Sequence, residues 1–239
     1  MIKYNTYNRN CLRLSLFCFA AATGLLFIIF MYGCGSVGTI KSQINDLTFQ
    51  QENLPVRTIR VAIANDNSRE EQEINALLQE ASNSLREQVG IELNRVMTKP
   101  IKWSTRTPEG MVEDMRKNFS TLEKRQFDIA IASVTYTASD KGLQLLGLIL
   151  PIPVWDGCID STYRRYIVIK KLDKNILLHE IFHSLIFSED HDTGGVMHAV
   201  QIQIVPGVPL NITEYLTPED RKESLKNKWR NFNQIARSN

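Results

Sequence analysis

Histidine and cysteine are scarce in this 239-residue chain, and both are unevenly placed. Three of the four cysteines fall within the first 34 residues, so Cys158 alone remains in the rest of the chain. A disulfide within the folded part is therefore not expected. The four histidines all lie between His179 and His198, a concentration that marks this stretch as a candidate site.

An excess of charge of one sign is also lacking, because the chain holds 28 basic and 26 acidic residues. The first 33 residues contain three basic residues and no acidic one, which leaves 25 basic and 26 acidic residues for the remainder. Proteins that bind nucleic acid carry basic patches, and no basic block occurs here. A nucleic-acid partner is therefore not expected.

An uncharged apolar run extends from Leu14 to Tyr32, after the basic residues Lys3, Arg9 and Arg13. The run approaches the roughly 20 residues that cross a bilayer, and it exceeds the roughly 7–15 residues of a signal-peptide core. The basic flank is expected to stay in the cytoplasm. The sequence therefore predicts that the residues after this run are exported.

The segment MYGCGS, around Cys34, resembles the lipobox of bacterial lipoproteins, in which the cysteine is acylated after the signal segment is removed. This resemblance implies a lipid at Cys34 and a location in the cell envelope. An uncleaved transmembrane anchor and a buried core helix are the alternatives. We expect an export or anchor segment at 1–33, a polar tether at 34–54 and one folded domain at 55–239.

Strand and helix patterns alternate within the folded domain, which predicts an α/β fold with a mixed, mostly parallel twisted sheet and two packing helices. Pro151 and Pro153 exclude a central strand between 142 and 160, where an edge strand or a rim loop remains. We also expect a small C-terminal subdomain that ends in a helix. The expected strands cover 56–66, 91–103, 127–137 and 162–171, and the expected helices cover 68–91 (capped by Ser68), 109–126, 175–187 and 217–236.

The helix at 175–187, for which Asp173 or Asn175 is the expected cap, is apolar around most of its circumference and should be buried on nearly every side. His179 and His183 lie four residues apart in it, so both imidazoles can reach a single ion. Glu180, roughly 100° round the helix from His179, can take a proton from water bound to that ion. A chance HExxH in a core helix is the alternative, which the clustering of all four histidines disfavours.

The segment HEIFHSLIFSEDHDTGGVMH resembles the matrixin branch of the metzincin metallopeptidases, whose pattern is HExxHxxGxxH followed by a methionine turn. The segment LTPEDRKESLKNKW also resembles the helix that closes the metzincin lower domain. The resemblance implies a metzincin-like α+β fold and a catalytic Zn²⁺. It also implies that Met197 forms an apolar floor beneath the metal.

The third metal ligand is not decided by the sequence. Without gaps, Ile186 takes the place of the metzincin glycine and Glu189 the place of the third histidine. If the helix continues past Ile186, the loop is longer and His191 coordinates instead; Asp190 is a further alternative. We favour His191, because isoleucine disfavours a left-handed turn and imidazole is the commonest zinc ligand. His198 would line the cleft or lie on the surface.

These features predict a monomeric zinc endopeptidase that acts on a peptide or protein substrate. The substrate would lie extended along the rim near Leu146–Val154, beside an edge strand. The loop at 199–210 would shape an apolar side-chain pocket.

Three alternatives to this prediction remain. One is a gluzincin-type site with Glu214 or Glu219 as third ligand, which the methionine turn disfavours. Another is a non-catalytic metzincin-like lipoprotein that acts as an envelope binding or scaffold protein. The third is an envelope-assembly lipoprotein with a structural metal. The intact Glu180 favours the enzyme over both lipoproteins.

Overall fold

The computed structural model describes residues 54–122, 126–147, 155–188, 195–197 and 214–236. All of them belong to the unit that spans residues 49–239. The expected export segment, Cys34 and nearly all of the tether lie outside these ranges. Among the residues that are described, no helix has the length and apolar character needed to cross a membrane.

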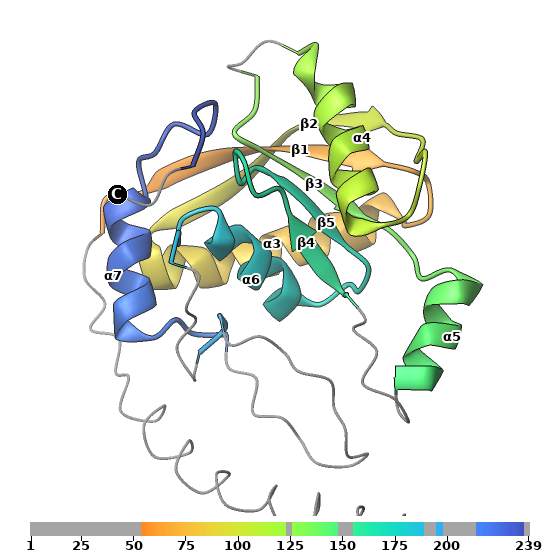
Figure 1. Cartoon of the computed structure of the whole chain (residues 1–239). Coiled ribbons are helices and arrows are strands. Elements are labelled where there is room, and N and C mark those ends of the chain that lie inside the picture. Colours follow the sequence, from red (N-terminus) through yellow and green to blue (C-terminus); the bar gives the residue numbers. More distant parts are fainter. Residues whose placement is uncertain (1–53, 123–125, 148–154, 189–194, 198–213, 237–239) are drawn as a thin grey trace, which may run out of the picture. The chain divides into compact units, whose positions relative to one another are not determined.

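Five strands form one sheet in the order β2-β1-β3-β5-β4 (Figure 1). Neighbouring strands are parallel except β4, which runs antiparallel to β5 at one edge. The prediction of an α/β fold with a mixed, mostly parallel sheet is therefore confirmed. The strands are β1 (Arg57–Asn65), β2 (Ile91–Pro100), β3 (Ile129–Ser133), β4 (Gly157–Ile159) and β5 (Tyr166–Ile169), and the helices are α3 (Glu71–Val89), α4 (Pro108–Ser120), α5 (Ala138–Gly147), α6 (Lys174–His183) and α7 (Pro218–Asn227).

The two faces of the sheet differ in the size of their side chains. Along β1, Ile59, Val61 and Ile63 belong to the cluster that contains α3 and α6, whereas Ala62 and Ala64 belong to the cluster that contains α4. β3 repeats this alternation of isoleucine and alanine. Figure 1 accordingly shows α4 on one side of the strands and α3 and α6 on the other. The small alanines leave room for three bulky side chains of α4, namely Met111, Met115 and Phe119.

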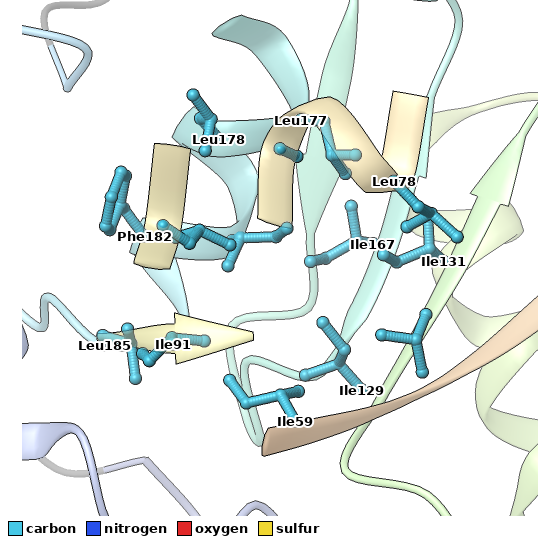
Figure 2. Close-up of a cluster of buried hydrophobic side chains, with 14 of the residues drawn as sticks. Ile59, Leu78, Ile91, Ile129, Ile131, Ile167, Leu177, Leu178, Phe182 and Leu185 are labelled. Carbon is cyan, nitrogen blue, oxygen red and sulfur yellow. The ribbon is translucent and has the colours of Figure 1, made fainter. Parts of the chain in front are cut away.

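The larger core cluster joins the sheet to α6 and to the turn after it (Figure 2). Leu177, Leu178, Phe182 and Leu185 are fully buried there. Burying one such side chain contributes about 1.5–3 kcal/mol, so the cluster fixes α6 firmly. The strand residues labelled around them in Figure 2 are Ile59, Ile91, Ile129, Ile131 and Ile167.

The start of α3 differs from the prediction, because its cap is Glu70 and not Ser68. Glu70 and Glu73 form a reciprocal capping box. The backbone N–H of Ser68 donates to the Asp66 carboxylate over 2.9 Å, so residues 66–68 form a turn before the helix. Because this local bond holds residues 66–68 in a turn, the helix begins a few residues later than predicted.

Helix α5 is not among the predicted elements, because the apolar segment after Gly142 favours an edge strand or a rim loop. A capping box begins it, in which the Thr137 N–H donates to Asp140 Oδ2 over 2.7 Å and the Asp140 N–H donates to Thr137 Oγ1 over 3.1 Å. The spacing of Thr137 and Asp140 was the available signal.

Several predicted elements are present but shorter. β5 begins at Tyr166 and not at 162, because Asp160 accepts the N–H groups of Tyr163 and Arg165 in a turn. α4 ends at Ser120 and not at 126, since the chain turns where the Leu122 N–H donates to Phe119 O. The helix predicted to reach 236 ends at 227, because the chain turns there: the Lys228 N–H donates to Leu225 O and the Arg230 N–H donates to Asn227 O.

Replacing Gly90 by alanine should destabilise the fold by about 1–2 kcal/mol in urea denaturation. Gly90 ends α3 with a φ of +65°, and an added Cβ would lie 2.7 Å from Lys228 Nζ and 3.0 Å from Leu54 Cβ. Gly142→Ala in α5 is the control, because nothing lies within 4 Å of its added Cβ. Helix propensity should make that variant about 0.5 kcal/mol more stable. Equal effects of the two substitutions would contradict this account.

Candidate metal centre

Helix α6 begins at a side-chain cap and runs through the core. Asp173 is the cap and accepts the Asn175 N–H over 2.9 Å, which decides between the two caps that the sequence offered. Four apolar residues of α6 are fully buried, as predicted for a helix enclosed on nearly every side: Leu177, Leu178, Ile181 and Phe182.

His179 and His183 meet on one face of this helix. Their Nε2 atoms lie 3.0 Å apart, and their rings are nearly perpendicular, with centroids 4.6 Å apart. Tetrahedral zinc with Zn–N bonds of about 2.0–2.1 Å places two ligand nitrogens about 3.3 Å apart. The two imidazoles therefore fit a single zinc ion with a small adjustment.

The short segment 195–197 orients the first histidine. His179 Nδ1 lies 2.9 Å from the carbonyl oxygen of Val196. Because a carbonyl only accepts, Nδ1 carries the hydrogen, and Nε2 is left as the nitrogen suited to a metal. Met197 is fully buried in the cluster that contains α6. Sequence reasoning found Met197 but missed Val196, whose contribution comes from its backbone and leaves no side-chain signal.

Glu180 is buried beside the edge strand, with 6% of its surface exposed. Burial raises the pKa of Glu180 to about 8. A Cβ on Gly157 of β4 would lie 2.6 Å from Glu180 Oε1, so the absence of a side chain there leaves room for the carboxylate. The pKa of the neighbouring Cys158 thiol is raised to about 12, mainly by burial and to a smaller extent by the negative charge of Glu180. Gly157 was missed, although glycine within a strand often marks such a close approach.

The candidates for the third ligand, Glu189, Asp190 and His191, lie outside the described residues, as does His198. So do most of the predicted substrate rim and the loop at 199–210. Within the ranges that are described, no three His, Cys, Asp or Glu side chains form a group that could hold a metal ion. The third ligand therefore stays a prediction.

The gluzincin alternative would use one of two other carboxylates. Glu214 accepts a hydrogen bond from Ser84 Oγ over 2.7 Å and pairs with Lys174 at the start of α6. Glu219 is exposed at the start of α7. Glu214 is thus already engaged by other side chains, which disfavours it as a ligand.

The prediction that the helix continues to 187 is wrong. The last α-helical bond joins the Ile186 N–H to Phe182 O over 2.8 Å, and α6 itself ends at His183. Ile186 does not take a left-handed conformation, since the only described residues other than glycine with positive φ are Asn67 and Arg164. The helix ends early because side chains from other parts of the chain bind the backbone carbonyls at its end. The expectation that Ile186 prolongs the helix, which was one of the two arguments for His191, therefore no longer holds.

No protein-family model matches this chain, and no curated protein sequence matches it either. A function for this chain must therefore be proposed from the chemistry of its own residues. That function must explain three features: the two histidines, the buried carboxylate and the adjacent strand edge.

Glu180→Gln should stabilise the metal-free protein by about 4 kcal/mol at pH 8. The folded-state pKa of about 8 lies above the ordinary value of 4.5, so the folded protein binds more protons than the unfolded chain between these pH values. Wild-type stability should therefore fall as the pH rises from about 4.5 to about 8, and the glutamine variant should lack this loss.

Urea denaturation in the presence of a chelator, at several pH values, measures this difference. The gain should vanish near pH 4, where both states of the wild type are protonated. Glu80→Gln, at an exposed position of α3, is the control and should show no such gain. Parallel stability curves for wild type and Glu180→Gln would contradict the burial argument.

Proposed function

We propose that this chain is a zinc-dependent endopeptidase that hydrolyses bonds in an extended peptide or protein substrate. The observation that carries the proposal is the 3.0 Å approach of His179 Nε2 and His183 Nε2 on a buried helix. Glu180, which lies between the two histidines in the sequence, is buried on the same helix. This combination of two imidazoles and one carboxylate suits metal-assisted hydrolysis.

The metal ligands in this proposal are His179, His183 and one residue from the chain that follows α6. The carbonyl of Val196 supports the assignment of His179, because metal-bound histidines usually donate their second N–H to such a group. We keep His191 as the third ligand because imidazole is the commonest zinc ligand, with Glu189 as the alternative. Either set leaves one position open for water or substrate.

Glu180 acts as the general base and then as the general acid. A bound zinc ion supplies polarisation of the scissile carbonyl and an acidic water. With that ion in place, the Glu180 carboxylate would accept a proton from the attacking water and return it to the leaving amine. Burial raises the pKa of Glu180 in the metal-free protein, and the positive charge of a bound zinc ion would lower it again, towards the range in which a carboxyl group can both accept and donate a proton near pH 7.

The substrate is proposed to pair with β4. This strand is the last in the sheet order, so the described structure leaves one of its edges unpaired. A Cβ on Gly157 of β4 would lie 2.6 Å from Glu180 Oε1, so this strand lies beside the proposed base. An extended peptide can add to such an edge through main-chain hydrogen bonds. The predicted rim at 146–154 leads directly into this strand.

We further propose that the enzyme is exported and held at a membrane by residues 1–33 or by a lipid on Cys34. The support comes from the apolar run and from the lipobox-like segment around that cysteine. The near-neutral balance of charge in the remainder fits a protein substrate better than a nucleic acid.

The non-catalytic alternative accounts less well for Glu180. Burial penalises the charged form of this carboxyl, as the direction of its pKa shift indicates. A helix with a purely structural role gains nothing from that penalty, whereas a proton-transfer group requires a tuned pKa.

The purified protein should contain about one zinc per chain and should cleave an unstructured substrate such as casein. Glu180→Gln should keep the zinc and lower kcat/KM by at least about 100-fold, because it removes the proton acceptor. Metal analysis and a proteolysis assay measure the two properties separately. Wild type without zinc at neutral pH, or unchanged proteolysis in Glu180→Gln, would overturn the proposed function.

His191→Ala should lose most of the bound zinc, while Glu189→Ala should keep it. Losing one of three protein ligands weakens zinc binding strongly, whereas losing a non-ligand leaves it intact. Metal content after dialysis against a weak chelator distinguishes the two variants. The reverse result would assign Glu189 as the ligand and leave the peptidase proposal in place.

A further inference from the structure

The last four carbonyls of a helix lack partners within it and must be satisfied from elsewhere. At the C-terminal end of α6 and in the turn that follows it, these are the carbonyls of residues 183–186, because the last α-helical N–H belongs to Ile186. Many helices solve this problem with a glycine in the left-handed conformation. This chain has no glycine between His183 and Ser188.

Side chains from distant parts of the sequence bind all four of these carbonyls. Arg164, just before β5, and two residues at and beyond the end of α7 supply the donors. The bonds run from Arg164 Nη1 to His183 O (3.3 Å) and Ile186 O (2.5 Å), from Arg230 Nη1 to Ser184 O (2.7 Å) and from Asn227 Nδ2 to Leu185 O (2.8 Å).

The next two residues are held as well. Glu223 of α7 accepts the Phe187 N–H over 2.6 Å, the Ser188 N–H over 3.3 Å and the Ser188 hydroxyl over 2.8 Å. The guanidinium groups of Arg164 and Arg230 also lie 5.4 and 5.2 Å from the centre of the Phe187 ring, within cation–π range. Every residue from His183 to Ser188 therefore has a specific contact.

Electrostatics and backbone conformation support this arrangement. Burial lowers the pKa of Arg230 to about 10, which still leaves it charged at neutral pH. Positive charge is favourable at a helix C-terminus, where the helix dipole is negative. Arg164 has a φ of +49°, a conformation that residues other than glycine rarely adopt. Such strained residues persist where the surrounding structure requires them.

We infer that Arg164, Asn227 and Arg230 are positioning residues for the metal centre. Arg164 holds the backbone carbonyl of His183, the proposed second ligand, while Arg230 and Asn227 hold the next two carbonyls. Together they set the direction in which the chain leaves α6 towards the proposed third ligand. They do in this chain what a glycine turn does in the family that the motif resembles. The inference rests on the proposed function, because it requires a metal at the histidine pair.

Arg164→Met should lower the zinc affinity of the full chain by about 10- to 100-fold, the range typical when a supporting group of a metal ligand is lost. Competition with a chromophoric chelator measures the affinity. Cobalt replacing zinc should also show an altered visible absorption spectrum, because that spectrum reports the geometry of the ligands. Arg164→Lys keeps one cationic donor and should recover part of the affinity.

Arg95→Met is the matched control. Arg95 makes comparable hydrogen bonds to Glu71, Asn75 and Thr98, but it lies on β2, at the edge of the sheet opposite β4. This variant should change stability without changing zinc affinity or the cobalt spectrum.

Asn227→Asp is the second test, because it removes one donor with almost no change in shape. It should weaken zinc binding in the same direction, and it decides the question if Arg164→Met does not fold. Wild-type affinity and spectrum in folded Arg164→Met, or in Asn227→Asp when that variant alone folds, would overturn this inference alone. No zinc binding by the wild type would overturn the proposed function and, with it, this inference.

Discussion

Helix α6 is buried on every face except the one that carries the half-buried histidines, so most of the polar groups at its ends find partners inside the protein. The requirement explains the surroundings of the helix. The Val196 carbonyl takes the first histidine N–H, and distant side chains take the last four carbonyls. Glu180 is left in an apolar environment, which raises its pKa. Burial therefore gives the helix its stability and its chemical character together.

The sheet supports this helix through an unequal division of side-chain size. Isoleucine and valine from the central strands face α6 and α3, and alanine faces α4. The bulkier layer fixes the histidine helix against the strands. At the edge, Gly157 has no side chain, which leaves room for Glu180 to approach β4. The arrangement brings the proposed base close to β4, whose outer edge is unpaired among the residues that the structure describes.

The sequence predicted the features that depend on local patterns. Alternating β-branched residues marked the strands, and the spacing of His179 and His183 predicted that their rings would meet. The early end of α6 was not predictable in this way, because its donors come from residues about twenty positions before and forty positions after it. Gly157 and Val196 were missed for a related reason: one acts through the absence of a side chain and the other through its backbone. Helix α5 did have a local signal at Thr137 and Asp140, which an apolar run obscured.

The contacts of Arg230 also bear on the order in which the fold forms. Arg230 and Asn227 bind carbonyls that lie about forty positions earlier in the sequence. The turns of α6 are local and can form early, whereas contacts over such a separation require the closure of a long loop. We therefore expect the backbone after His183 to take its final path late in folding, once the segment that follows α7 has packed against it. The helix brings the two histidines together, and tertiary folding fixes the chain that leaves them.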